Sequence, residues 1–165
     1  VEGLQILADG EPDLVMVAPD IGSIKIARAY SDFLGTPLAI ADKRRVTPNQ
    51  AEVMNLIGEV EGRNVLMVDD MIDTGGSLTK AAEKLRKEGA KEIYAACTHG
   101  LLSGDAIKQL EDSPITELVL TDSIPLKPGV VSAKIKVLTA SRLFAEAIRR
   151  THYEESISSL FVNHR

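Results

Sequence analysis

Residues 65–77 read VLMVDDMIDTGGS, and this stretch decides the fold because it joins an apolar strand, three carboxylates and a glycine turn. Apolar residues without polar alternation predict a strand over residues 65–69, within a parallel sheet covered on both faces. Apolar residues at helical spacing follow and predict a helix over residues 77–88, with Gly89 as its stop. A strand, a tight turn and a helix in this order are typical of an α/β domain.

The polar groups of this stretch gather where the strand gives way to the helix. Asp69 and Asp70 fall at the carboxyl end of the strand, the edge at which open α/β sheets bind ligands. The glycines of the TGGS turn allow backbone N–H groups to approach an anion at the helix N-terminus. Ionised carboxylates accept hydrogen bonds from vicinal hydroxyls. The stretch therefore predicts a site for one ligand with a phosphate and a sugar diol, and ribose 5-phosphate fits both.

Other phosphate motifs are absent from the same stretch. No Gly-Lys-Ser/Thr follows the turn, so it is not a Walker loop, and it is not a GxGxxG dinucleotide turn. The plainer alternative is an acidic strand end followed by an ordinary glycine turn. A bare TGGS would favour that alternative, whereas the whole strand-DDMIDTGGS-helix unit favours the sugar phosphate site.

The rest of the chain alternates in the same way and predicts one α/β domain over residues 1–165, a parallel sheet with helices on both faces. The predicted strands are 14–18, 38–41, 92–98, 118–120 and 135–138, and the predicted helices are 24–34, 103–111 and 141–150. Residues 51–58 are a weaker candidate, for a strand that would pair antiparallel near the loop at residues 43–45.

Composition excludes several classes of protein. With 44% hydrophobic and 26% charged residues, the chain has enough apolar material for one core. A net charge of -5 with no Trp argues against nucleic-acid binding. No apolar run approaches a membrane span and no charged leader precedes an apolar stretch, so we expect a cytoplasmic protein. Cys97 is the one cysteine and is expected to pack as a small buried hydrophobe.

The segment VDDMIDTGGS resembles the phosphoribosyl-pyrophosphate motif shared by type I phosphoribosyltransferases and ribose-phosphate pyrophosphokinases. Upstream, DKRR at 42–45, PN at 48–49 and AEVMN at 51–55 are similar to the pyrophosphokinases and not to the transferases. The resemblance continues through CTHG at 97–100, LSG at 102–104, TDSIP at 121–125, AEAIRR at 145–150 and ESISSLF at 155–161. Nearly the whole chain thus resembles the second half of a ribose-phosphate pyrophosphokinase, which implies a type I phosphoribosyltransferase-like fold.

The resemblance implies an activity and its parts. The reaction would be Mg²⁺-dependent transfer of the β,γ-pyrophosphoryl group of ATP to the C1 hydroxyl of ribose 5-phosphate, giving phosphoribosyl pyrophosphate and AMP. Asp69 and Asp70 would hold the sugar hydroxyls, and Asp73 would orient or relay at the sugar. Lys43 and Arg45 match the catalytic-loop lysine and arginine that close over ATP. The 5-phosphate would be held by Thr74, Gly75, Gly76 and Ser77.

The family's subunit is longer and has two similar halves, so the resemblance implies that these residues are a fragment. The family's first half supplies much of the adenine pocket and a metal-binding histidine. We therefore expect the fragment alone to be inactive. Two alternatives remain open, namely a type I phosphoribosyltransferase and a non-catalytic regulatory homologue that binds a true synthase.

A second turn, Pro19-Asp20-Ile21-Gly22-Ser23, lies between a predicted strand and a predicted helix. In the family such a turn grips the pyrophosphate, which implies roles for Asp20, Gly22 and Ser23 and makes Asp20 a candidate metal ligand. The family's usual form is D-x-G-G, and here Ser23 replaces the second glycine, while Ile26 stands where a basic residue is expected. A positive φ would strain a serine at that position.

The tail, residues 151–165, is a candidate regulatory segment. In the family it helps to form an ADP or phosphate effector site between subunits, which implies roles for Ser156, Ser158 and Phe161 and a homo-oligomer. The alternative is a frayed terminus with one docking Phe. For His99, after a predicted strand, we expect a structural role.

Overall fold

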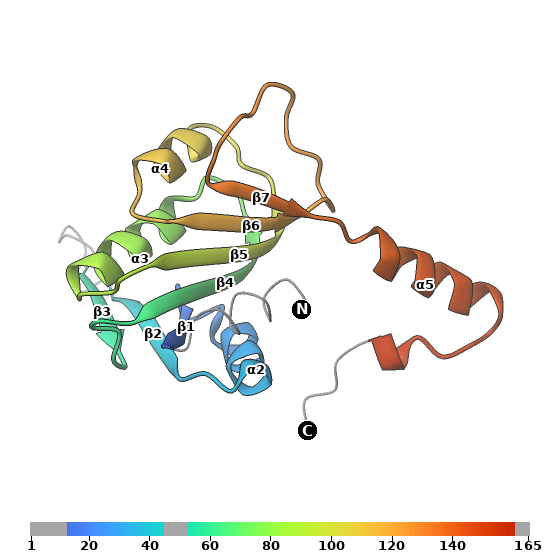
Figure 1. The fold of residues 1–165 in the computed structure, drawn as a ribbon, viewed down its shortest axis with the longest axis horizontal. Coiled ribbons are helices and arrows are strands. Elements are labelled where there is room, and N and C mark those ends of the chain that lie inside the picture. Colours follow the sequence, from blue (N-terminus) through green and yellow to red (C-terminus); the bar gives the residue numbers. More distant parts are fainter. Residues whose placement is uncertain (1–12, 45–52, 161–165) are drawn as a thin grey trace.

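The computed structural model describes residues 13–44 and 53–160, with the backbone alone at 42–44 and 53–54. The described residues form one seven-stranded sheet with helices on both faces (Figure 1). In chain order the elements are β1 (Leu14–Ala18), α2 (Ile24–Leu34), β2 (Leu38–Arg44), β3 (Val53–Ile57), β4 (Asn64–Ile72), α3 (Gly76–Lys87), β5 (Ile93–Gly100), α4 (Ala106–Asp112), β6 (Glu117–Thr121), β7 (Ile135–Leu138), α5 (Ser141–His152) and the short 3-10 helix η1 (Ser158–Leu160).

The sheet order is β3-β2-β1-β4-β5-β6-β7, which places β4 at the centre. All neighbouring strands pair parallel except β2 and β3, which pair antiparallel. The parallel sheet and the antiparallel strand within residues 51–58 are therefore confirmed. Strand β2 runs to Arg44, beyond the predicted end at residue 41, because its ladder with β3 continues through Lys43 opposite Met54.

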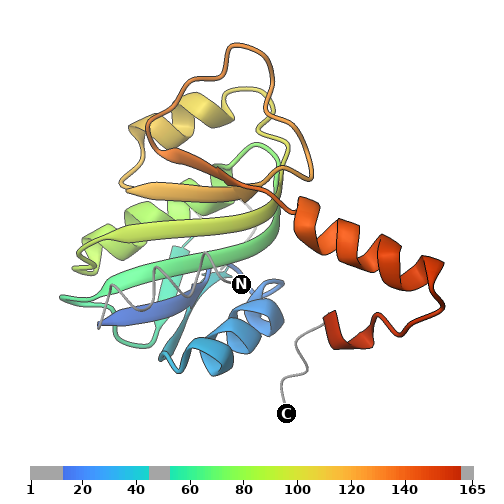
Figure 2. The same ribbon diagram turned by 45° about the vertical axis from the view of Figure 1, so that its right-hand side comes forward.

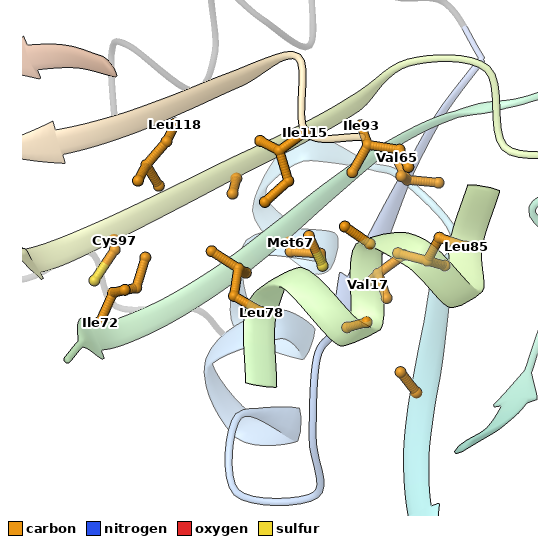
Figure 3. Packing of buried hydrophobic residues seen from close by; sticks show 14 of the residues in the cluster. Val17, Val65, Met67, Ile72, Leu78, Leu85, Ile93, Cys97, Ile115 and Leu118 are labelled. Atoms are coloured by element: carbon orange, nitrogen blue, oxygen red, sulfur yellow. The ribbon is translucent and has the colours of Figure 1, made fainter. Parts of the chain in front are cut away.

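The core has two layers because the side chains of β4 alternate between the faces of the sheet. Val65 and Met67 pack in the layer under α3 and α4, whereas Leu66 and Val68 pack in the layer under α2. Figure 3 shows Leu78 and Leu85 of α3 in the first layer, where Leu85 is fully buried. Cys97 is a free thiol in the same layer, as its apolar surroundings in the sequence predicted.

Helix α5 departs from this pattern. It projects from the end of β7 away from the sheet (Figures 1 and 2), and none of its residues is buried. Leu143, Phe144 and Ile148 are 55%, 59% and 68% exposed. The helix itself is confirmed, but its apolar side contacts no other element of the described part of the chain closely enough to be buried.

Polar residues of α5 bind the segment that follows the helix, residues 155–159. Glu146 accepts hydrogen bonds from Arg149 at 3.0 Å and from Arg150 at 2.7 Å, and Arg149 also binds Glu155 at 2.7 Å. Arg150 donates to the backbone oxygen of Ser156 at 3.2 Å. The segment after α5 is thereby tied back to its last turn.

None of the helices within residues 13–44 and 53–160 is long and apolar enough to cross a membrane.

The first prediction contrasts two leucines. Leu85→Ala should lower the free energy of unfolding by about 2–5 kcal/mol, because it opens a cavity in a fully buried layer. Leu143→Ala, at a position 55% exposed on α5, should change it by less than about 0.5 kcal/mol. Urea denaturation of both variants measures the difference. Equal losses would mean that α5 is packed in solution.

Candidate functional site

Strands β4 and β5 extend beyond their neighbours. Strand β1 pairs with β4 only as far as Met67, whereas the β4–β5 ladder continues to Ile72 opposite Gly100. The predicted strand end at residue 69 was therefore wrong by three residues. Asp69 and Asp70 lie within this projecting part of β4, at the carboxyl edge of the sheet where the sequence placed them.

The two acidic residues have different surroundings. Asp69 is half-buried, and its Oδ1 accepts a hydrogen bond from the N–H of Asp70 at 2.9 Å. Burial raises the pKa of Asp69 to about 6, and the negative charges of Asp20 and Asp70 add to this rise. Asp70 is exposed. At pH 7 and above the ionised carboxylate of Asp69 can accept hydrogen bonds from hydroxyl groups.

The turn after β4 leads directly into the N-terminus of α3. Gly75 is the N-cap residue with a φ of +76°, a conformation that favours glycine. No side chain caps this end of α3 by a hydrogen bond. The first N–H groups of a helix have no partner within the helix. An anion at Gly75, Gly76 and Ser77 would therefore meet N–H donors and the positive end of the helix dipole.

A loop after β5 folds against this turn and holds it. The N–H of Leu101 donates to the Ile72 oxygen at 2.9 Å, and the N–H of Ser103 donates to the Asp73 oxygen at 3.0 Å. The Ser103 hydroxyl also donates to the Asp73 carboxylate. Helix α4 therefore begins at Ala106 and not at residue 103 as predicted, because Ser103 is engaged with the turn.

Ser103 is a supporting residue that the sequence did not reveal. The LSG segment contributed to the family resemblance, but no local pattern indicates that its serine reaches a carboxylate thirty positions away. The bond holds Asp73 beside the TGGS turn, residues 74–77.

The turn between β1 and α2 lies beside the same edge. Asp20, Gly22 and Ser23 line an open hollow together with Asp69 and Asp70. The structure thus brings the predicted pyrophosphate turn and the two predicted diol carboxylates to one hollow. Ser23 has a φ of -85°, so the positive φ that would strain a serine is not adopted.

The remaining predicted site residues are Lys43 and Arg45 and three residues of the tail. Lys43 lies near the end of β2, where only its backbone is described, and Arg45 lies outside the described residues. Ser156 and Ser158 are exposed, in the segment after α5, which lies away from the sheet (Figure 2). Phe161 lies outside the described residues. Of these candidates, the structure describes the side chains of Ser156 and Ser158 alone, and neither lines the hollow.

The donor set around the hollow suits Mg²⁺. Asp20, Asp69 and Asp70 offer hard oxygen ligands, and the pKa of Asp69 responds to the charge of Asp20. Among the described residues no group of three or more His, Cys, Asp or Glu side chains forms a ready-made metal site. Mg²⁺ is commonly held by one or two carboxylates plus substrate phosphates, so these residues fit a shared site.

His99 has a bonded position at the end of β5. Its Nδ1 lies 2.9 Å from the Ser123 hydroxyl, which donates to the backbone oxygen of Thr98 at 2.8 Å. The contact ties the end of β5 to the segment after β6 and fits the structural role that we expected.

The fold and the hollow together define a type I phosphoribosyltransferase-like domain. A solved structure of APRTase from Giardia lamblia, complexed with 9-deazaadenine, has the same fold, with a TM-score of 0.59 and 18% identity over 72% of this chain and 74% of that chain. Phosphoribosylpyrophosphate synthetase from Mycobacterium smegmatis is much more similar. It has a TM-score of 0.81 and 35% identity, covering 89% of this chain and 47% of that chain.

Sequence comparisons identify the family within this class of fold. The model of the phosphoribosyl synthetase-associated domain matches residues 38–162, and the chain therefore belongs to that family. The ribose-phosphate pyrophosphokinase of Clostridium acetobutylicum is 48% identical, over 98% of this chain and 53% of that protein. That of Caldanaerobacter subterraneus subsp. tengcongensis is 54% identical, over 90% of this chain and 47% of that protein. The chain thus spans about half the length of these curated relatives.

The raised pKa of Asp69 gives a prediction about stability. Between the ordinary value of 3.8 and about 6 the folded state binds this proton more tightly than the unfolded state, so stability falls as the pH rises through that window. Asp69→Asn removes this loss and should raise the melting temperature at pH 7 by about 2–4 °C, for roughly 1 kcal/mol after solvent screening. At pH 3.5 it should have little effect. Thermal unfolding followed by circular dichroism at both pH values measures it.

Asp122→Asn is the control of opposite sign. The N–H of Ala140 donates to Asp122 and lowers the pKa of its carboxyl, so that variant should lose stability at pH 7. An Asp69→Asn variant that is also less stable at pH 7 would contradict the burial argument.

Proposed function

We propose that this domain binds ribose 5-phosphate and takes part in Mg²⁺-dependent transfer of the β,γ-pyrophosphoryl group of ATP to the C1 hydroxyl, giving phosphoribosyl pyrophosphate and AMP. The observation that supports this most is the convergence of two acidic residues of β4 and the turn before α2 on one hollow, with an uncapped helix N-terminus at the end of the same β4 segment. Curated relatives named ribose-phosphate pyrophosphokinase support the same reaction.

The sugar phosphate is held from two sides. The N–H groups at the start of α3 and the hydroxyls of Thr74 and Ser77 bind the 5-phosphate, with Gly75 and Gly76 giving close access. Asp69 and Asp70 accept hydrogen bonds from the 2- and 3-hydroxyls. Asp73, fixed by Ser103, orients the turn between these two contacts. The C1 hydroxyl is thereby presented at a fixed angle, which is the main protein contribution to such transfers.

The pyrophosphate turn supplies the second half of the site. Asp20, Gly22 and Ser23 face the hollow opposite the carboxylates of β4. Asp20 would hold a Mg²⁺ shared with the substrate, and the ion would supply positive charge against the phosphate chain. Lys43 and Arg45 stabilise charge that develops on the transferred group.

Two rivals are weaker. A type I phosphoribosyltransferase would use the same ribose site, but the DKRR and AEVMN segments resemble the pyrophosphokinases. Base-dependent consumption of phosphoribosyl pyrophosphate would favour this rival. A non-catalytic regulatory homologue is suggested by Ser23, and the presence of both Lys43 and Arg45 counts against it.

The tail and the assembly belong to the same proposal. Ser156, Ser158 and Phe161 contribute to an ADP or phosphate effector site in a cytoplasmic homo-oligomer. The ties of Arg149 and Arg150 to residues 155–159 would then place these serines at a defined distance from α5.

Loss of one diol carboxylate should weaken sugar binding and keep the fold. Asp69→Asn and Asp70→Asn should each lower the affinity for ribose 5-phosphate about ten- to hundredfold, because each removes a charged hydrogen bond. Calorimetric titration at pH 8, where Asp69 is ionised, measures this. Asp112→Asn, at an exposed position of α4, is the matched control and should bind normally. Unchanged affinity in both site variants would remove the diol assignment.

The isolated 165 residues should bind ribose 5-phosphate but release AMP from ATP slowly or not at all. They span about half the length of their curated relatives, and the family resemblance places much of the adenine pocket elsewhere. An AMP-release assay with ribose 5-phosphate, ATP and Mg²⁺ decides this. Robust turnover would show that these residues hold a complete ATP site. In that case Lys43→Ala and Arg45→Ala should lower kcat far more than they raise KM.

A further inference from the structure

The turn between β1 and α2 closes on itself through Asp20 and Ser23. The N–H of Ser23 donates to Asp20 Oδ1 at 2.9 Å. The N–H of Asp20 donates to Ser23 Oγ at 3.3 Å, and that hydroxyl donates to the backbone oxygen of Asp20 at 3.0 Å. Each side chain thus caps the backbone of the other, and two N–H groups of the turn are already occupied.

One of the occupied groups, the N–H of Ser23, lies next to those that an anion would use. Anions bind at a helix N-terminus through its free N–H groups, and Ser23 directly precedes the first residue of α2. The carboxylate of Asp20 also lies close over the turn, since a Cβ built on Gly22 would be 3.2 Å from Oδ1. A second anion cannot take this position while the carboxylate remains there, because like charges at such distances repel.

We propose that the Asp20–Ser23 pair is an internal cap that must open before the turn binds pyrophosphate, and that Ser23 is a positioning residue that sets the affinity of the turn. The inference rests on the proposed function, because that function brings a pyrophosphate group to this turn. Opening the cap frees the Ser23 N–H and moves the Asp20 carboxylate out of the anion position.

The hydroxyl of Ser23 is the part of the cap that can be removed cleanly. It makes two of the three hydrogen bonds, and the residue is only 4% exposed. If the hydroxyl holds the cap closed, its removal favours the open turn and strengthens pyrophosphate binding. If it instead donates to the bound pyrophosphate, its removal weakens binding. The two roles therefore predict opposite signs.

The test is a calorimetric titration of inorganic pyrophosphate, at constant Mg²⁺, into the wild-type chain and the Ser23→Ala variant. We expect the variant to bind about three- to tenfold more tightly, because two modest hydrogen bonds no longer oppose opening. Amide hydrogen exchange without ligand gives a second readout. The N–H of residue 23 should exchange faster in Ser23→Ala than in the wild type, since the cap opens more often.

Ser31→Ala is the matched control. Ser31 is a buried serine of the same helix whose hydroxyl donates to the Thr36 oxygen at 2.6 Å, at the other end of α2. This variant should lose stability without a change in pyrophosphate affinity. Should Ser23→Ala fail to fold, Ser23→Gly removes the same hydroxyl and is expected to show the same tighter binding.

The outcomes separate this inference from the proposed function. Weaker or unchanged pyrophosphate binding by the Ser23 variants, or no binding by any of the proteins, overturns the internal cap. Titration of ribose 5-phosphate into the same samples tests the sugar site independently. Normal sugar binding with no gain for pyrophosphate would leave the proposed sugar site standing and remove the inference, whereas loss of sugar binding alone would do the reverse.

Discussion

The burial of β4 on all sides is the constraint on which the site depends. Residues 65–67 pair with β1 on one edge and β5 on the other, while α3 and α2 cover the two faces. A strand in this position cannot carry an ionised side chain until it leaves the packed layers. Asp69 is the first residue past Val68 and is still half-buried, which raises the pKa of its carboxyl. The carboxyl edge is therefore where the polar chemistry of this chain must begin.

Local patterns predicted much of the fold. The apolar run of β4, the apolar stripe of α3 and the alternation of strands and helices are all readable within short windows, and the structure has each of them. The end of β4 and the start of α4 were missed because both are set by distant partners. The ladder with β5 carries β4 on to Ile72, and the bond of Ser103 to Asp73 delays α4. No periodicity within a window records such pairings.

The site was readable to a similar extent. Asp69, Asp70 and the TGGS turn were found because their order along one segment already implies their places at a strand end and a helix start. The contacts between Asp20 and Ser23 could also have been predicted, since Asp and Ser side chains commonly bond to nearby backbone groups in such turns. The exposure of the apolar side of α5 could not be predicted, because periodicity predicts an amphipathic helix and does not show what packs against it.

The contact between the TGGS turn and the loop after β5 limits how far the length of that loop can change. Surface connections usually tolerate insertions and deletions, because few contacts depend on their length. Here three N–H groups and one hydroxyl of residues 101–103 bind residues 72 and 73. A length change in this connection would displace the turn that precedes Gly75. Natural variation in loop length should therefore collect elsewhere on the molecule, and the spacing from β5 to α4 should stay fixed.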